Sequence, residues 1–415
     1  MAETRFDKPP SWGVPCEPPH WMAEEGPEAS VAVWCQCSLV RNLADFMFPG
    51  SCSDEDKKAV EERVLSALED LHPCEGGHYY SLGDLSRPEV LCLAECRLIP
   101  YELARNGRHG GVYVCDGRST GISVNGSDHL CITTLASGCQ MQELWTRLTA
   151  LDDRLAGRLD YAFDKRLGFL TTSLAHTGTG LKASVVLHLP GLVMLNGMAN
   201  LVQGARQRRQ AVHGFKSVVS QGSASIVRPA HDSLPVPAEA VPARDLGDGF
   251  YMDLTGALYG DVAEAEGDLF MLTNLATLGV SEEEILFHLR HAASEIIAQE
   301  RAARESFIVR PAHDSLRAKG LKRLEDRVWR AVGIAENARV VGFTEAVGLW
   351  SSLRLGIETG LLSGHSFQDL DELLFASQAG HARMRRESDS ADDEWMLDIE
   401  RADLLRARFA SHRED

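Results

Sequence analysis

The sequence predicts an α+β fold made of a strand-and-helix domain followed by an all-helical domain. Residues 112–124 and 130–135 alternate and are rich in β-branched side chains, which is typical of strands. At 415 residues, 44% of them hydrophobic, the chain can bury the cores of two domains. From about residue 301 onward the apolar spacing is helical throughout, at residues 324–332, 344–355, 366–376 and 394–409.

Helices are also predicted within the first part of the chain. Residues 53–71 place Val60, Val64 and Leu68 on one face of an amphipathic helix. A second helix is marked by leucines at positions 144, 148, 151 and 155. Ser281 and Glu284 can form a capping box, in which each side chain accepts a backbone N–H of the other. The sequence therefore predicts a helix that starts after Ser281 and closes the first domain.

Charge and hydropathy exclude several classes of function. The formal net charge is −18 and the pI is about 5.3, which disfavours binding to nucleic acid or to anionic membranes. Residues 183–203 contain no formally charged side chain, but His188, Pro190 and Asn196 interrupt the run. A buried strand followed by a buried helix is thus expected there, rather than a membrane span. The polar N-terminus has no apolar signal segment, so a cytoplasmic protein is expected.

The ten cysteines all lie between Cys16 and Cys139. Cys35 and Cys37 are two residues apart and Cys92 and Cys96 four, so neither pair has the C-x2-C spacing of a zinc site. A cytoplasmic chain also rarely keeps disulfides. Buried free thiols and no metal site are therefore expected.

Two segments are expected to lie outside the packed domains. Residues 1–25 are rich in proline and acidic side chains, which predicts a flexible leader. Residues 215 to about 250 are rich in Ser, Pro and Ala, which predicts a surface insertion. The insertion contains IVRPAHDSL at 226–234, repeated unchanged at 308–316. Duplication explains the repeat; paired docking loops are the alternative.

Two motifs carry a resemblance to a known family. Residues 173–184 read SLAHTGTGLKAS, and residues 26–42 begin Gly-Pro-Glu and end Arg-Asn. Both resemble motifs of the ATP:guanidino phosphotransferases, and within them of the bacterial protein arginine kinases. The resemblance implies an antiparallel sheet flanked by helices over residues 26–300, then a helical domain over 301–415 that dimerises in the family. It also implies ATP and Mg²⁺ as cofactors if the chain is active.

The resemblance also assigns the nucleotide-binding positions of this chain, several of which have lost their usual residues. The family's arginines fall on Gln36, Ser38 and Cys131, its histidine falls on Arg97, and another arginine falls on Lys182. Lysine keeps the charge but not the planar fork of arginine. The implied ATP positions are Gln36, Ser38, Arg97, Cys131, Lys182, Ala183, Ser184, Val185, Val186, Tyr259 and Gly260.

The implied catalytic positions are Ser127 and Asp261. Ser127 stands where the family has its catalytic glutamate, and serine has no proton affinity near neutral pH. Asp261 keeps a carboxylate on a shorter stem. Phosphoryl transfer depends on cations around the moving group and on an oriented nucleophile. These replacements predict a catalytically impaired pseudokinase that acts as a binding or regulatory module.

An active arginine kinase with a remodelled site is the alternative. In that case Arg97, Lys182, Arg206, Arg208 and Arg209 would converge on the phosphates from new directions, so enzymatic activity is left open. The expected partners are protein substrates, proteins that carry phosphoarginine, a second copy of the chain or an active paralogue. Near the C-terminus, Asp398 and Arg401 match a motif with which protein arginine kinases bind phosphoarginine, although Leu397 replaces its first arginine.

Overall fold

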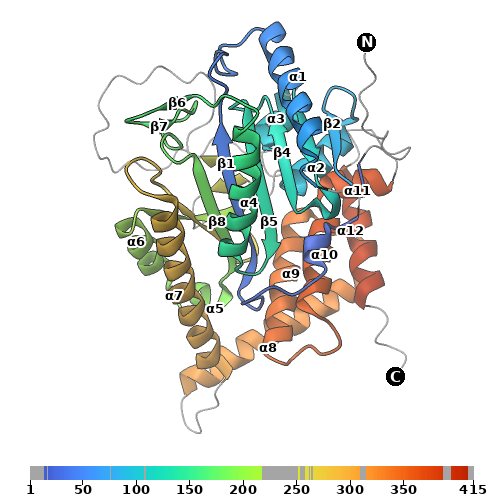
Figure 1. Cartoon of the computed structure of the whole chain (residues 1–415). Coiled ribbons are helices and arrows are strands. Elements are labelled where there is room, and N and C mark those ends of the chain that lie inside the picture. Colours follow the sequence, from blue (N-terminus) through green and yellow to red (C-terminus); the bar gives the residue numbers. More distant parts are fainter. Residues whose placement is uncertain are drawn as a thin grey trace.

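The computed structural model contains a large sheet with helices on both faces (Figure 1). Ten strands form one sheet in the order β10-β11-β9-β12-β8-β1-β5-β4-β3-β2, and every neighbouring pair is antiparallel. The structure describes residues 14–15, 17–74, 76–106, 109–216, 251–252, 258–260, 262, 265–308, 315–386 and 394–409.

The central strands of the sheet are the longest. Its members are β1 (Ala32–Arg41), β2 (His78–Ser81), β3 (Gly111–Val114), β4 (Thr120–Val124), β5 (Leu130–Ser137), β8 (Leu181–His188), β9 (Gln210–Lys216), β10 (Tyr251–Met252), β11 (Leu258–Gly260) and β12 (Leu269–Asn274). A separate two-stranded sheet is formed by β6 (Phe163–Asp164) and β7 (Gly168–Phe169).

In the described chain, six α-helices lie between strands in sequence and a seventh follows the last strand; five more helices come after it. The first group comprises α1 (Asp54–Leu71), α2 (Arg87–Glu95), α3 (Tyr101–Asn106), α4 (Met141–Ala156), α5 (Pro190–Met194), α6 (Met198–Gln207) and α7 (Glu282–Ile308). The second group comprises α8 (Ser315–Asn337), α9 (Phe343–Glu358), α10 (Phe367–Ala376), α11 (Ala379–Arg385) and α12 (Glu394–Phe409).

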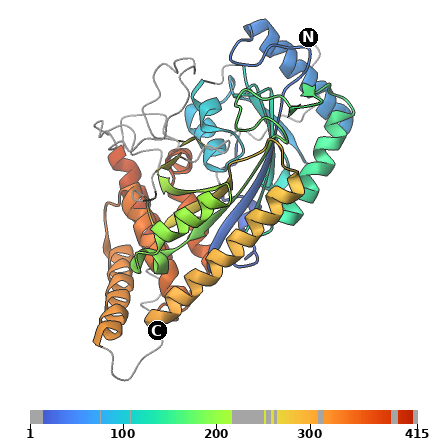
Figure 2. The same cartoon turned by 90° about the vertical axis from the view of Figure 1, so that its left-hand side faces the viewer.

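Strand alternation separates the sheet into two faces with different neighbours. On the outer face, Cys35, Cys37 and Leu39 of β1 join a core with residues of α1, α4 and α7. On the inner face, Trp34 of β1 joins a second core with Trp350 of α9 and other residues of the C-terminal helices. Figure 2 shows α1, α4 and α7 on one side of the sheet and the orange-to-red C-terminal helices on the other. The C-terminal helices are therefore packed directly on the sheet.

Most of the predicted elements are confirmed. The helix predicted over residues 53–71 is α1, with a capping box between Ser53 and Asp56. At the start of α7 the Ser281 N–H donates to Glu284 Oε2 at 2.9 Å, and the Glu284 N–H donates to Ser281 Oγ at 3.2 Å. The run at 183–203 forms most of β8, all of α5 and the first part of α6. No described helix is long and apolar enough to cross a membrane. The predicted domain boundary near residue 300 falls inside α7, and the division stays a prediction.

The described part of the predicted leader is packed rather than flexible. Val14 and Met22 are buried, and Met22 belongs to the core between the sheet and the C-terminal helices. Arg118 donates hydrogen bonds to the carbonyl oxygens of Pro15 and Pro18, at 3.0 and 2.9 Å. The prediction from composition was wrong for these residues, because it missed their apolar anchors. Residues 217–250, which make up nearly all of the predicted insertion, lie outside the described residues, as does the first IVRPAHDSL copy; the second lies mostly outside them.

The expectation that every cysteine is a free thiol was also wrong. Cys74 and Cys115 form a disulfide, with their Cα atoms 5.8 Å apart. They are 41 residues apart in sequence. They meet because β2 pairs with β3. This pairing places His78, which comes shortly after Cys74, opposite Val114, which directly precedes Cys115. A pairing of this kind depends on strand register and cannot be deduced from cysteine spacing.

Candidate functional site

A row of polar side chains crosses the inner face of the sheet at its centre. We call it the polar row; it consists of Gln36 and Ser38 on β1, Cys131 and Thr133 on β5, and Lys182 and Ser184 on β8. Strand register places Ser38 between Thr133 and Lys182. All of these side chains are buried except that of Lys182, which is partly exposed. Five of the predicted nucleotide positions are therefore neighbours in space: Gln36, Ser38, Cys131, Lys182 and Ser184.

Four uncharged members of the polar row are hydrogen-bonded to one another. The Gln36 amide donates to Ser38 Oγ at 3.0 Å, and Ser38 Oγ lies 3.0 Å from Thr133 Oγ1. Cys131 Sγ continues the chain at 3.6 Å from Thr133 Oγ1. Lys182 is the only formally charged residue among the described inner-face positions of β1, β5 and β8. The row has become a hydrogen-bonded network with one cation at its edge.

Three other predicted nucleotide positions do not belong to the polar row. Ala183 and Val185 belong to the outer-face core, because alternate residues of β8 point to opposite sides. Val186 lies on the inner face but packs in the core beneath the C-terminal helices. The side chains of Tyr259 and Gly260 and the whole of Asp261 lie outside the described residues.

Arg97 is held in the core between the sheet and the C-terminal helices. Its guanidinium carbon lies 4.3 Å from the Trp34 ring centroid and 5.8 Å from that of Phe375. The residue is 4% exposed. Cation–π stacking between two aromatic rings holds this side chain in a packing role. The expectation that Arg97 could reach a nucleotide is not met in this conformation.

The arginines at the end of α6 do not converge on the polar row either. Arg208 forms an ion pair with Glu295 of α7, with 2.8 Å between Nη1 and Oε2. Leu201 and Ala205 place α6 against the outer-face core. Arg208 is thus on the opposite side of the sheet from Lys182, and Arg206 and Arg209 are exposed nearby in sequence. The convergence expected for a remodelled site is wrong for Arg208.

A carboxylate that the sequence motifs did not reveal lies beside Ser127. Ser127 Oγ donates to Glu102 Oε2 at 2.6 Å, and Glu102 belongs to α3. Thr172 donates to the Ser127 carbonyl at 2.8 Å, which ties this loop to the glycine-containing segment before β8. Ser127 and Glu102 are 25 positions apart, so no local pattern joins them. Ser127 therefore presents a hydroxyl bonded to a carboxylate.

Asp128 and His129, which follow Ser127, hold neighbouring loops together. Asp128 Oδ1 accepts hydrogen bonds from the Asn42 amide at 2.6 Å and from the Thr172 N–H at 2.7 Å. Burial raises the pKa of the Asp128 carboxyl, although these hydrogen bonds oppose the change. His129 Nδ1 accepts the Leu43 N–H at 3.0 Å, and burial lowers the pKa of this imidazole to about 4. Both residues act as structural anchors.

The two glycines of the segment before β8 are required by the close approach of other groups. Gly178 has φ of +119°, and a Cβ atom there would lie 2.2 Å from the Thr277 carbonyl oxygen. Gly180 has φ of +69°, and its Cβ would lie 2.5 Å from Nη1 of Arg41. Arg41 is buried and forms an ion pair with Asp152 of α4, with Nη2 2.8 Å from Oδ2. These retained residues therefore shape the scaffold.

Asp398 and Arg401 lie together on α12. Arg401 Nη1 is 2.5 Å from Asp398 Oδ1, and its Nε donates to the Ser377 carbonyl at 2.7 Å. Arg401 is 1% exposed. Burial lowers the pKa of Arg401, while Asp398 opposes that change. The carboxylate thus already holds a guanidinium from its own helix.

A group of side chains that could bind a metal ion lies outside the polar row. Among the described residues, Cys92, Cys96 and His381 bring two sulfurs and an imidazole nitrogen within 4.8 Å of one another. No metal site was expected from cysteine spacing alone, because His381 is 285 positions from Cys96. Distant segments of the chain therefore supply a ligand set that no sequence motif contains.

Comparison with known proteins identifies the family. The model of the ATP:guanido phosphotransferase C-terminal catalytic domain matches residues 59–228 and 252–303, and that of the protein-arginine kinase McsB C-terminal domain matches 321–415. A protein-arginine kinase from Halalkalibacterium halodurans is 32% identical over 94% of both chains. One from Pelotomaculum thermopropionicum is 32% identical over 94% of this chain and 96% of its own. The chain belongs to the protein-arginine kinase family.

Solved structures support the same fold. The duplicated taurocyamine kinase from Schistosoma mansoni matches with a TM-score of 0.51 at 17% identity, over 73% of this chain and 37% of that one. Within this family, the positions that this chain shares with the pattern include Gly178, Gly180 and Arg41, which are scaffold residues here. The replaced positions Gln36, Ser38 and Cys131 all lie in the polar row.

Proposed function

We propose that this member of the protein-arginine kinase family is a pseudokinase, which keeps the kinase scaffold and serves as a binding or regulatory module. The observation that supports this proposal most directly is the polar row, in which four buried neutral side chains are hydrogen-bonded to one another beside Lys182. A magnesium-bound triphosphate requires several cations and donors to be held in place. The side chains of the polar row do not fit such a ligand, so we assign them no step of phosphoryl transfer.

The expected decrease in the rate of phosphoryl transfer supports this proposal. Removing one preorganised donor or cation from a site of this kind typically lowers the rate by about 10²- to 10³-fold. Three of the implied arginine positions carry Gln36, Ser38 and Cys131, and the implied base position carries Ser127. Such effects are not additive. Although the combined decrease in rate is therefore smaller than the product of the single effects, we expect the replacements together to leave little phosphoryl transfer.

As a binding module, the chain would act through protein partners. We propose a cytoplasmic location and partners drawn from substrates of active kinases, proteins carrying phosphoarginine, a second copy of this chain or an active paralogue. Asp398 and Arg401 are the proposed phosphoarginine contacts. Arg401 Nη2 is buried and makes no hydrogen bond within the described part of the chain, so a phosphate oxygen reaching it would complete its bonding.

Binding of Mg-ATP separates the pseudokinase from an enzyme. A ligand present at about 100 times its Kd stabilises a protein by about 2.7 kcal/mol, which a thermal-shift assay detects readily. We expect millimolar Mg-ATP to leave the unfolding temperature of the wild-type protein and of Lys182→Ala unchanged. A shift in the wild type that Lys182→Ala removes would overturn the proposal.

Phosphoarginine binding is tested in the same assay. We expect free phosphoarginine to raise the unfolding temperature, and Arg401→Ala to remove the increase. The readout is the ligand-induced shift of each protein rather than its absolute stability, because Arg401 is buried and its loss destabilises the fold. Arginine with inorganic phosphate is the control ligand mixture. Equal shifts in both proteins would exclude Arg401 as the contact.

A second candidate function, an active kinase with a remodelled site, rests on Glu102. Its carboxylate lies 2.6 Å from the hydroxyl of Ser127, the implied base position. A carboxylate supplied from α3 could orient a guanidinium in place of the lost glutamate. This candidate predicts that Glu102→Gln abolishes any phosphoryl transfer while leaving the unfolding temperature nearly unchanged. If no transfer is measured in the wild type, the candidate fails at once.

A further inference from the structure

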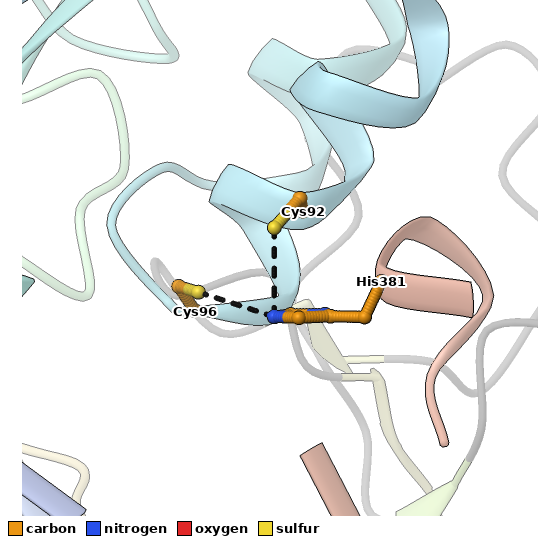
Figure 3. A group of neighbouring side chains, drawn as sticks. All are labelled: Cys92, Cys96 and His381. Atoms are coloured by element: carbon orange, nitrogen blue, oxygen red, sulfur yellow. Dashed lines mark hydrogen bonds between the residues drawn. The ribbon is translucent and has the colours of Figure 1, made fainter. Parts of the chain in front are cut away.

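Two cysteines and a histidine from distant parts of the chain converge in a closed space. Cys92 lies on α2, Cys96 is the residue that ends this helix, and His381 lies on α11. His381 Nε2 is 3.5 Å from Cys92 Sγ and 3.6 Å from Cys96 Sγ, and both sulfurs point at this nitrogen (Figure 3). Each of the three residues is 0% exposed. No residue of this group belongs to the polar row.

The spacing is that of ligands around one zinc ion. Zinc binds thiolate sulfur at about 2.3 Å and imidazole nitrogen at about 2.0–2.1 Å in a tetrahedral arrangement. Those bond lengths and angles place a sulfur and a nitrogen ligand about 3.6 Å apart. The two measured separations of 3.5 and 3.6 Å agree with that value. A thiol–imidazole hydrogen bond has a similar length, so these distances alone do not distinguish the two arrangements.

The surroundings of the imidazole favour a metal ligand. Glu95 Oε2 lies 2.7 Å from His381 Nδ1, and Glu95 also accepts the backbone N–H groups of Gly380 and His381, at 2.6 and 3.1 Å. A carboxylate on Nδ1 favours a proton at that nitrogen, so Nε2, which faces both sulfurs, is the nitrogen that would bind a metal ion. Metal-binding histidines almost always have such a partner.

The local charge and ligand types favour zinc over harder cations. Two thiolates balance Zn²⁺, and Arg118, whose Nη1 lies 4.0 Å from Cys96 Sγ, balances Glu95. Thiolate and imidazole ligands select zinc rather than magnesium or calcium. The Cys92 thiol donates a hydrogen bond to the Pro15 carbonyl at 3.7 Å, and this bond would be lost when the thiolate binds zinc. Cys16, the next residue, lies outside the described residues and is not counted among the ligands.

We propose that Cys92, Cys96 and His381 bind a zinc ion, with a water molecule completing its tetrahedral coordination. The site would join the sheet region through α2 and the C-terminal helices through α11. α2 and α11 already lie in close contact, since a Cβ atom on Gly380 would be 2.7 Å from the Cys92 backbone nitrogen. Zinc bound there would add its binding free energy to the stability of this junction.

The test uses the full-length chain, purified in a reducing agent that does not bind metals, stripped with a chelator and refilled with zinc. Elemental analysis after desalting should give about one zinc ion per chain. Refilling should raise the unfolding temperature by at least about 5 °C over the stripped protein. Cobalt in place of zinc should give the visible absorption of a tetrahedral site and a thiolate-to-cobalt charge-transfer band. Less than about 0.1 zinc per chain after refilling, or cobalt spectra without thiolate bands, overturns the proposal.

Variants locate the ion. Cys96→Ser and His381→Ala should each lower bound zinc at least about tenfold. Cys52→Ser is the matched control, because Cys52 is another free cysteine near a histidine, with Sγ 3.7 Å from His129 Nε2, and it should keep full zinc content. If Cys96→Ser or His381→Ala fails to fold, the cobalt spectrum of the wild-type protein still decides. Full zinc content in both variants would place the metal elsewhere and contradict the proposal.

Discussion

Arg41 illustrates how single charged side chains hold this scaffold. Its guanidinium is buried, paired with Asp152 and bonded to the Thr179 carbonyl at 2.9 Å. Asp152→Ala would leave that charge buried without its partner. We therefore expect a loss of about 3–5 kcal/mol in the free energy of unfolding, measured by urea denaturation. Asp152→Asn, which can still accept a hydrogen bond, should lose less; equal stability of Asp152→Ala and the wild type would contradict the structural role.

His129 predicts a dependence of stability on pH. Its pKa is about 4 in the folded protein, below the value of 6.5 for a free side chain, because burial disfavours the imidazolium. Between these values the unfolded chain binds a proton that the folded chain does not, so stability is lost as pH falls from 6.5 toward 4.

The matched comparison for this prediction is His129→Gln. Lowering the pH from 7 to 4.5 should destabilise the wild type by about 2–3 kcal/mol more than the variant. His188, whose pKa is also lowered by burial, is present in both proteins and cancels in the comparison. Identical pH dependence in urea denaturation would show that His129 is not buried as a neutral imidazole.

The candidate site could be predicted from single residues only in part. Gln36, Ser38, Cys131 and Lys182 were predicted as one site, and strand register does place them side by side. Glu102 and His381 were missed, because their partners are distant in sequence. Arg97 was predicted as a nucleotide position, and its packing between Trp34 and Phe375 could not be predicted because no local motif reveals it.

Among the elements, helix starts marked by a serine cap were predicted well because that signal is local, whereas α8 begins at Ser315, before the predicted start at residue 324. Capping boxes at Ser53, Ser281 and Ser366 use side chains three residues apart, and all three are present. The helix predicted at residues 394–409 has those bounds in the structure. The contact between α2 and α11 had no such signal, since it joins residues 285 positions apart in sequence.

Gly380 offers a test of that contact between elements. A Cβ atom there would lie 2.7 Å from the Cys92 backbone nitrogen and 2.8 Å from Glu95 Oε2. Gly380→Ala should therefore destabilise the protein by about 1–3 kcal/mol. Gly348→Ala in α9 is the control, because nothing lies within 4 Å of its Cβ position, and it should be stabilising by about 0.5–1 kcal/mol. Chemical denaturation measures both; the same sign for the two variants would mean that α2 and α11 are not in contact as described.

At the scale of the whole molecule, the sheet and the C-terminal helices share one core. Trp34 and Met271 of the sheet pack with Trp350 of α9 and Phe375 of α10. Across the same junction, Arg327 of α8 is bonded to Asp268, with Nη2 2.5 Å from Oδ2, and donates to Ser351 Oγ at 2.9 Å. The two halves of the chain should therefore be energetically coupled.

Calorimetry tests this coupling. We expect the wild type to unfold in one cooperative transition. Trp34→Ala, which removes a buried ring from the shared core, should lower the stability by about 3–5 kcal/mol and move the whole transition. Two separate transitions in the wild type, of which Trp34→Ala shifts only one, would show that the halves unfold independently.

The pseudokinase proposal concerns the molecule as a whole, because an intact scaffold surrounds a site without its usual charges. The most direct measurement is transfer of radiolabel from [γ-³²P]ATP with Mg²⁺ to an arginine-rich protein substrate, with Lys182→Ala and Glu102→Gln assayed alongside the wild type. We predict that all three proteins give no acid-labile label above the enzyme-free background. Label that the wild type incorporates and that either variant loses would contradict the proposal.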